Sequence, residues 1–218
     1  MDGRPGPAPD TVTVLWCTTD GDERGRARAL LVRQVAAVLE VDPSAIWMEH
    51  EPGGRPVMAG AAEGVRVSMS HTRGALAVAF SAGGHVGVDV EALRVLPGQA
   101  LARRWLDKAE AAWVAALPES ERSVGFLWLW TQKEAVGKAL GLGLRAGGMS
   151  RRMPSPGRWP LIAGASPVPL ELPDDPGTAA DAALVVGGSH VVGVAVRGAG
   201  GPAPRVEVRR VTTSRTSG

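Results

Sequence analysis

Two carboxylates lie two residues apart in the segment GVDVE, residues 87–91. Valines alternate with them, and this pattern predicts a strand with its valines on the buried side. Asp89 and Glu91 then share the other face, roughly 6 to 7 Å apart. Acids in this spacing are most often the solvated side of a half-exposed strand. Their chemistry therefore depends on what faces them.

A second polar group lies in WTQKEAVGKALGLGL, residues 130–144. The apolar pattern predicts a helix over residues 126–140, on which Glu134 and Lys138 are neighbours because they are four residues apart. Such a pair is most often a surface ion pair of small value. However, two of the chain's three lysines, Lys133 and Lys138, lie in this motif, and an ammonium can give up a proton whereas a guanidinium does not. If this helix faces the strand, three acids and a lysine meet in one pocket.

Oxygen ligands without a Cys or His cluster favour a hard cation such as Mg²⁺, with Mn²⁺ as a substitute. Lysines beside such a site would neutralise phosphate oxygens, so the combination indicates phosphoryl-type transfer. Other motifs do not fit. A Walker A loop needs Gly where Gln132 stands, and no GxSxG element supports a triad built on Ser70 and His71.

The composition is that of a soluble globular protein, with 44% hydrophobic and 21% charged residues among 218. A net charge of +2 is too small to argue for nucleic acid as a partner. The single cysteine leaves no internal disulfide and no CxxC zinc site. No apolar run approaches the length of a membrane span or a signal peptide, so we expect a cytoplasmic protein with no membrane contact.

Periodicity and turn residues predict an alternation of strands and helices. Helices are expected over residues 22–40, 101–117 and 126–140. Strands are expected over residues 11–17, 46–51, 65–69, 75–81 and 85–91, and a closing hairpin over 182–186 and 190–196. The three strands between residues 65 and 91 suggest a small antiparallel meander. From residue 198 onward the Gly, Pro, Arg and Ser content predicts a disordered tail.

Three motifs in this order resemble those of the 4′-phosphopantetheinyl transferase superfamily, in its double-length, surfactin-synthetase-activating type. The family shows a serine–histidine element, then G-[IV]-D-[IV]-E, then W-x-x-K-E-A-x-x-K-x-x-G-x-G-L. In this chain they stand as Ser70-His71, as residues 87–91, and as Trp130, Lys133, Glu134, Ala135, Lys138, Gly141, Gly143 and Leu144. The long motif is the specific one.

The resemblance implies an α+β fold of two similar halves related by a pseudo-twofold axis, each a small, mainly antiparallel sheet packed with helices. The implied organisation is a flexible N-terminus (1–10), a first half (11–98), a second half (99–197) and the tail (198–218). The site would lie between the halves of a monomer, with the acids of the strand in one half and Glu134 in the other.

The resemblance also implies an enzyme that moves the 4′-phosphopantetheine arm of coenzyme A to a serine of an apo acyl or peptidyl carrier protein, releasing adenosine 3′,5′-bisphosphate. The carrier could serve fatty acid, polyketide or nonribosomal peptide synthesis. The implied Mg²⁺ ligands are Asp89, Glu91 and Glu134, and the implied catalytic residues are Glu134 and Lys138. The implied coenzyme A contacts are Arg24, Arg55, Pro56, Ser70, His71, Lys133 and Lys138, with Glu110 as an acid on the pantetheine side.

The chain departs from the family pattern in two places. Few residues precede the first predicted helix, where the family carries basic residues near the 3′-phosphate. Arg24 stands where an alignment without gaps places a family arginine, and Arg26 or Arg28 could substitute for it. The loop from Arg151 to Arg158 has no counterpart. Two other function classes are compatible with the motifs: a non-catalytic relative that binds coenzyme A or a carrier, and a Mg²⁺-dependent hydrolase of the coenzyme A pyrophosphate.

Overall fold

The computed structural model describes residues 10–143, 148–154, 167–170, 177–185, 189–198 and 204–212. The fold is mixed α+β, which confirms the predicted class. Residues 1–9 of the predicted flexible N-terminus and residues 155–158 of the arginine-rich loop lie outside the described residues. Among the helices that are described, none is long and apolar enough to cross a membrane.

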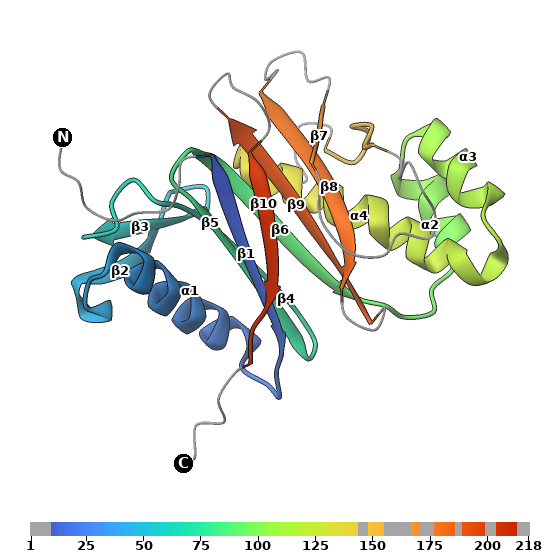
Figure 1. Ribbon diagram of the computed structural model, residues 1–218. Helices are drawn as coiled ribbons and strands as arrows, with labels where there is room; N and C mark the ends of the chain where they lie inside the picture. The colour runs from blue at the N-terminus through green and yellow to red at the C-terminus, as the bar shows by residue number, and fades with distance from the viewer. Residues whose placement is uncertain are drawn as a thin grey trace.

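The first sheet has the strand order β10-β1-β5-β4 (Figure 1). Its strands are β1 (Thr11–Thr18), β4 (Arg66–Thr72), β5 (Ala75–Ser81) and β10 (Arg205–Arg210). The strand β5 is antiparallel to both β1 and β4, whereas β10 is parallel to β1. Helix α1 (Glu23–Leu39) covers one face, where Leu31 and Val35 share a core cluster with Val78 and Phe80 of β5.

The predicted helix over residues 22–40 is confirmed, because both ends of α1 have capping residues. The Asp22 side chain accepts a hydrogen bond from the Gly25 amide at 3.1 Å, and Glu40 ends the helix in the left-handed conformation. The short helix η1 (Pro43–Ala45) then leads into a separate hairpin, β2 (Ile46–His50) and β3 (Pro56–Gly60).

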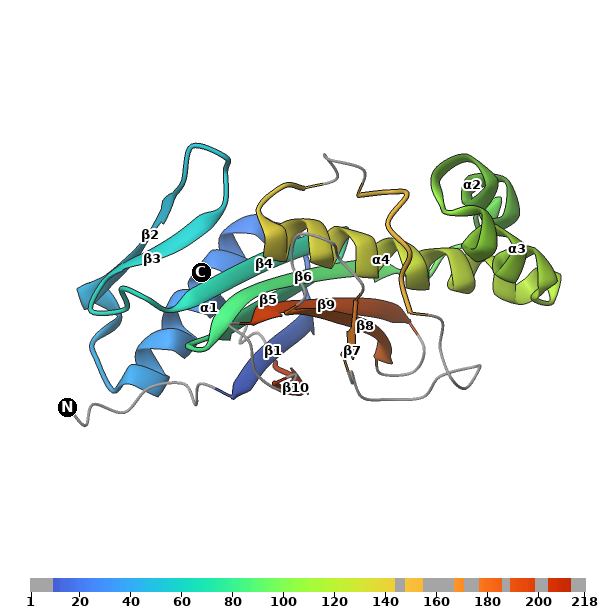
Figure 2. The ribbon, with the colours of Figure 1, turned by 90° about the horizontal axis from the view of Figure 1, so that it is seen from above.

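The second sheet has the order β6-β9-β8-β7, with all pairs antiparallel. Its strands are β6 (Gly84–Ala92), β7 (Val168–Pro169), β8 (Thr178–Val185) and β9 (His190–Gly198). Helix α4 (Arg122–Leu140) lies along this sheet, as Figure 2 shows from above. The predicted closing hairpin is therefore confirmed as β8 and β9.

The two sheets pack against each other through small and β-branched side chains. Val86, Val88 and Val90 of β6 share a core cluster with Val12 and Val14 of β1. The predicted alternation in GVDVE is confirmed, because the valines face the other sheet and the opposite face of β6 turns toward α4. The layers are thus α1, the first sheet, the second sheet and α4.

Three expectations about the elements need correction. The strands β4 and β5 form the predicted hairpin, but β6 pairs with β9, so the expected meander of three strands is not found. Residues 205–210 of the expected disordered tail form β10 and extend the first sheet. The expected single helix over residues 101–117 is two helices, α2 (Gly98–Trp105) and α3 (Lys108–Ala116).

The break between α2 and α3 has a local cause. Asp107 is the N-cap of α3, and its backbone amide donates to Glu110 at 3.0 Å while its side chain accepts from the Ala109 amide. Trp105, at the end of α2, is 42% exposed. The short helix η2 (Glu119–Glu121) connects α3 to α4, which begins at Arg122, earlier than predicted.

Candidate active site

The helix α4 lies on the second sheet at two glycines. A Cβ at Gly87 of β6 would collide with the carbonyl oxygen of Ala135, and one at Gly193 of β9 would collide with that of Thr131. The helix backbone therefore rests directly on the strands. This close approach brings the side chains of Glu134 and Lys138 to the face of β6 that carries the acids.

This contact supports a prediction for Gly87→Ala. The added methyl group must push α4 away from β6, and overpacking of this kind costs about 1 to 3 kcal/mol of unfolding free energy. The measurement is urea denaturation, with Gly53→Ala as control, because a Cβ at Gly53 meets no atom within 4 Å. Equal stability of Gly87→Ala and the wild type would show that the helix does not need this contact.

Lys138 joins the helix to the acidic strand. Its Nζ lies 2.9 Å from Asp89 Oδ1 and donates to the Val88 carbonyl oxygen, also at 2.9 Å. Asp89 is buried at 6% exposure, whereas Lys138 stays partly open to solvent. The predicted juxtaposition of α4 and β6 is therefore present, with a cation and a carboxylate in direct contact.

Glu134 is partly buried beside the same groups. Burial raises the pKa of its carboxyl group, the negative charges of Asp89 and Glu91 raise that pKa further, and Lys138 opposes them. Glu91 forms a separate ion pair with Arg94, whose Nη1 lies 2.7 Å from Glu91 Oε2. The three acids and the lysine thus form one electrostatic cluster. Burial and like charge are conditions under which a carboxylate becomes a stronger base.

The residues of this cluster fit a hard cation in their chemistry. Asp89 Oδ2 is buried and has no hydrogen-bond partner among the described residues, so one carboxylate oxygen is left for a further ligand. As the side chains stand, no three His, Cys, Asp or Glu residues of the described segments are grouped closely enough to hold a metal ion. Glu91 is the acid whose carboxylate is already engaged elsewhere, by Arg94.

A pair of serines on β4 joins the two sheets at this point. The Ser70 hydroxyl donates to Asp89 Oδ1 at 2.7 Å, and the Ser68 hydroxyl accepts from the Val88 amide at 3.0 Å. The strands β4 and β6 are edge strands of different sheets, so these side chains take the place of a backbone ladder. Ser70, predicted to contact coenzyme A, instead lies buried behind Asp89.

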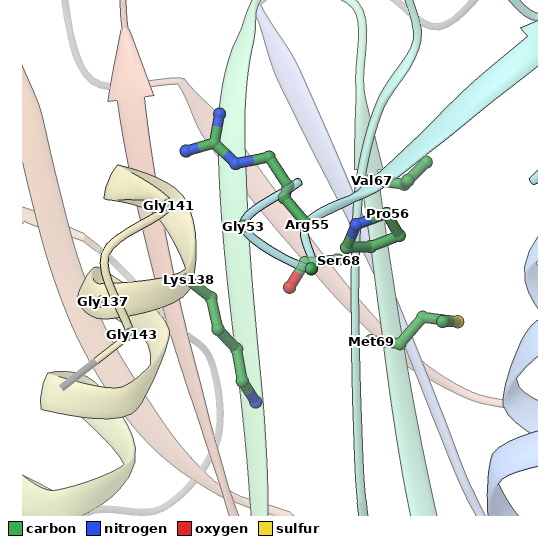
Figure 3. A pocket seen from close by; sticks show the side chains of 11 residues that line it. Gly53, Arg55, Pro56, Val67, Ser68, Met69, Gly137, Lys138, Gly141 and Gly143 are labelled. Carbon is green, nitrogen blue, oxygen red and sulfur yellow. The ribbon is translucent and has the colours of Figure 1, made fainter. Parts of the chain in front are cut away.

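A solvent-open pocket of about 220 Å³ lies beside the cluster, between the β2–β3 loop, β4 and the end of α4. Its lining includes the predicted residues Arg55, Pro56 and Lys138, together with Ser68. Figure 3 shows Arg55 extending from the loop toward Gly141, with the Ser68 hydroxyl on the side of α4.

Two contacts hold the guanidinium of Arg55 across this pocket. Its Nη1 lies 3.0 Å from His85 Nδ1 and its Nη2 donates to the Ala139 carbonyl oxygen at 3.4 Å, where a cation complements the end of α4. Burial and Arg55 lower the pKa of His85, which favours its neutral form. Gly141 ends α4 at φ 73°, and a Cβ there would collide with the Arg55 guanidinium.

The other predicted residues do not reach this pocket. Arg24 and His71 are exposed, and His71 lies near Glu23 of α1. Lys133 is fully buried at 0% exposure, with its Nζ 2.8 Å from Glu110 Oε2. Lys133, predicted to contact coenzyme A, and Glu110, predicted to lie on its pantetheine side, therefore form a buried ion pair with each other.

The Lys133–Glu110 pair holds the segment that follows α4. Lys133 Nζ also donates to the Arg151 carbonyl oxygen, and Glu110 Oε1 accepts from the Met153 amide at 2.7 Å. Burial lowers the pKa of Lys133, and the hydrogen bond to Glu110 opposes this effect. The pair is therefore an anchor for residues 151–153 and for α3.

Sequence reasoning did not identify three features of the site. The role of Ser68 and the contact between Arg55 and His85 depend on residues 20 and 30 positions apart, and no periodicity signals such pairs. Gly87 and Gly193 did carry a signal, since a glycine within a strand often marks the close approach of another backbone.

Comparisons with known proteins agree with this geometry. Residues 85–158, which include the acidic strand and the polar residues of α4, match the sequence profile of the 4′-phosphopantetheinyl transferase superfamily. The chain is also 28% identical over 120 residues to 4′-phosphopantetheinyl transferase HetI from Nostoc sp. (strain PCC 7120). The aligned segment covers 54% of this chain and 51% of that relative, about half its length. Over these residues the chain is similar to the 4′-phosphopantetheinyl transferase superfamily.

Proposed function

We propose that the protein transfers the 4′-phosphopantetheine arm of coenzyme A to a serine hydroxyl of an apo acyl or peptidyl carrier protein. The observation that carries the proposal is the position of α4, which holds Glu134 and Lys138 over Asp89 at one side of the pocket. A proton acceptor, a cation for phosphate and a carboxylate are the groups that this reaction needs.

In the proposed reaction, the serine oxygen of the carrier forms a bond to the phosphorus that bears the pantetheine. The bond from that phosphorus to the bridging oxygen breaks, and adenosine 3′,5′-bisphosphate leaves. Glu134 accepts the serine proton, directly or through a water, and its raised pKa suits it to this role. Lys138 stabilises the negative charge that grows on the leaving phosphate.

The oxygens that would hold Mg²⁺ are those of Asp89 and Glu134, with Glu91 once it is released from Arg94. When bound, the ion supplies positive charge to the pyrophosphate oxygens. Arg55 and Pro56 line the pocket in which we place the nucleotide, where the guanidinium offers charge and the proline ring offers an apolar surface. We also propose that the protein is of the double-length, surfactin-synthetase-activating type of this family.

Mass spectrometry tests the proposed function. The protein is incubated with an apo carrier domain, coenzyme A and Mg²⁺, and the expected result is a carrier that gains one phosphopantetheine group. A companion measurement is thermal unfolding, in which coenzyme A with Mg²⁺ should raise the melting temperature by several degrees. An unmodified carrier and no thermal shift at saturating ligand would refute the proposal.

A further inference from the structure

The two serines that join β4 to β6 differ in what they contact. They lie two residues apart on the same face of the strand, and both are buried, Ser68 at 4% and Ser70 at 8% exposure. Ser68 accepts from a backbone amide of β6, whereas Ser70 donates to a carboxylate. Ser68 therefore acts on the backbone alone, and Ser70 acts on an ionised side chain of the proposed active site.

The hydrogen bonds at Asp89 are unequally divided between its two oxygens. Oδ1 accepts from Ser70 at 2.7 Å and from Lys138 at 2.9 Å. Oδ2 is equally buried and accepts from no group of the described protein. A buried carboxylate oxygen without a donor is costly unless a ligand satisfies it.

We propose that Ser70 is a positioning residue: it fixes the Asp89 carboxylate so that Oδ2 alone is presented to the divalent cation. Lys138 alone cannot fix the carboxylate in this way, because its flexible ammonium can follow either oxygen as the carboxylate rotates. Ser70 is held by a strand of the first sheet and reaches Asp89 in the second. The first sheet thereby sets the orientation of a metal ligand on the other, an inference that rests on the proposed function.

The test is the affinity of the protein for Mn²⁺ in the presence of coenzyme A and without any carrier, followed by electron paramagnetic resonance of free Mn²⁺. Removal of a group that orients a metal ligand weakens metal binding by about 10- to 100-fold. We expect a loss of that size in Ser70→Ala. Ser70→Thr, which keeps a hydroxyl in a position that suits a β-branched residue, should restore most of it.

Ser81→Ala is the control, since Ser81 is a buried serine of the same sheet, on β5, whose hydroxyl accepts from the Gly83 amide, and it does not line the pocket. It should lose unfolding free energy as Ser70→Ala does, while its Mn²⁺ affinity stays at the wild-type value. If Ser70→Ala does not fold, Ser70→Cys carries the same expectation, because its thiol is a weak donor of similar size.

The outcomes separate this inference from the proposed function. Wild-type affinity in Ser70→Ala, or an equal loss in Ser81→Ala, would overturn the positioning role while phosphopantetheine transfer by the wild type stands. A wild-type protein that binds no Mn²⁺ with coenzyme A present would overturn both the metal site and the role of Ser70.

Discussion

Glu134→Gln is expected to abolish phosphopantetheine transfer while the protein remains folded and still binds coenzyme A. The amide keeps the size of the side chain but cannot accept the serine proton, and the loss of a general base lowers a rate by roughly 100- to 10,000-fold. The measurement is the rate of carrier modification, together with the affinity for coenzyme A by titration calorimetry. Normal turnover in this variant would remove Glu134 from its proposed role.

The same variant should be more stable than the wild type in metal-free buffer. Because the pKa of Glu134 is raised in the folded protein, the native state binds this proton more tightly than the unfolded chain does. The wild type therefore loses stability as the pH rises from the ordinary range of a carboxyl group through the raised pKa. Glutamine does not ionise and escapes this loss.

The expected melting temperatures follow from the upward shift of the Glu134 pKa. They should be similar for both proteins below the ordinary carboxyl range, and the variant should melt a few degrees higher at neutral pH. A wild type that is the more stable protein at neutral pH, without metal, would contradict the assignment of Glu134 as a destabilised, partly buried acid.

Lys133→Met is expected to destabilise the protein strongly. It leaves Glu110 buried with only backbone donors, and breaking a buried ion pair by removing one partner costs about 3 to 5 kcal/mol. The measurement is the unfolding free energy from urea denaturation. The double variant Lys133→Met with Glu110→Gln should recover part of the loss, because no buried charge is then left unpaired.

This variant also distinguishes two roles for Lys133. If Lys133 anchored a phosphate of coenzyme A, as the family motif suggested, its substitution would weaken coenzyme A binding and leave the unfolding free energy nearly unchanged. The buried pair predicts the opposite order of effects, with a large loss of stability. Lys138→Met serves as the comparison, because Lys138 lines the pocket and is partly exposed.

The sequence predicted the center of the fold because the relevant signals are local. The alternation in GVDVE and the three- and four-residue spacing in α4 depend on near neighbours, and both elements lie as predicted. From the residues alone their contact was conditional, and the family resemblance implied it. The α+β class likewise followed from the resemblance.

The remaining features depend on pairings between distant residues. Nothing local distinguishes a β6 that continues a meander from one that pairs with β9, about one hundred residues later in the chain. The strand β10 is short and rich in arginine, and it is stabilised by its parallel partner β1. The hydrogen-bond and ion-pair partners of Ser70 and Lys133 could likewise not be predicted. A family motif identifies residues but does not show which of them contact each other.

The most direct test of the account measures the release of adenosine 3′,5′-bisphosphate from coenzyme A with and without an apo carrier. We expect one molecule of nucleotide to be released for each carrier modified, and none when the carrier is absent. Release at a similar rate without the carrier would instead identify a hydrolase that uses the same acids and lysine on water.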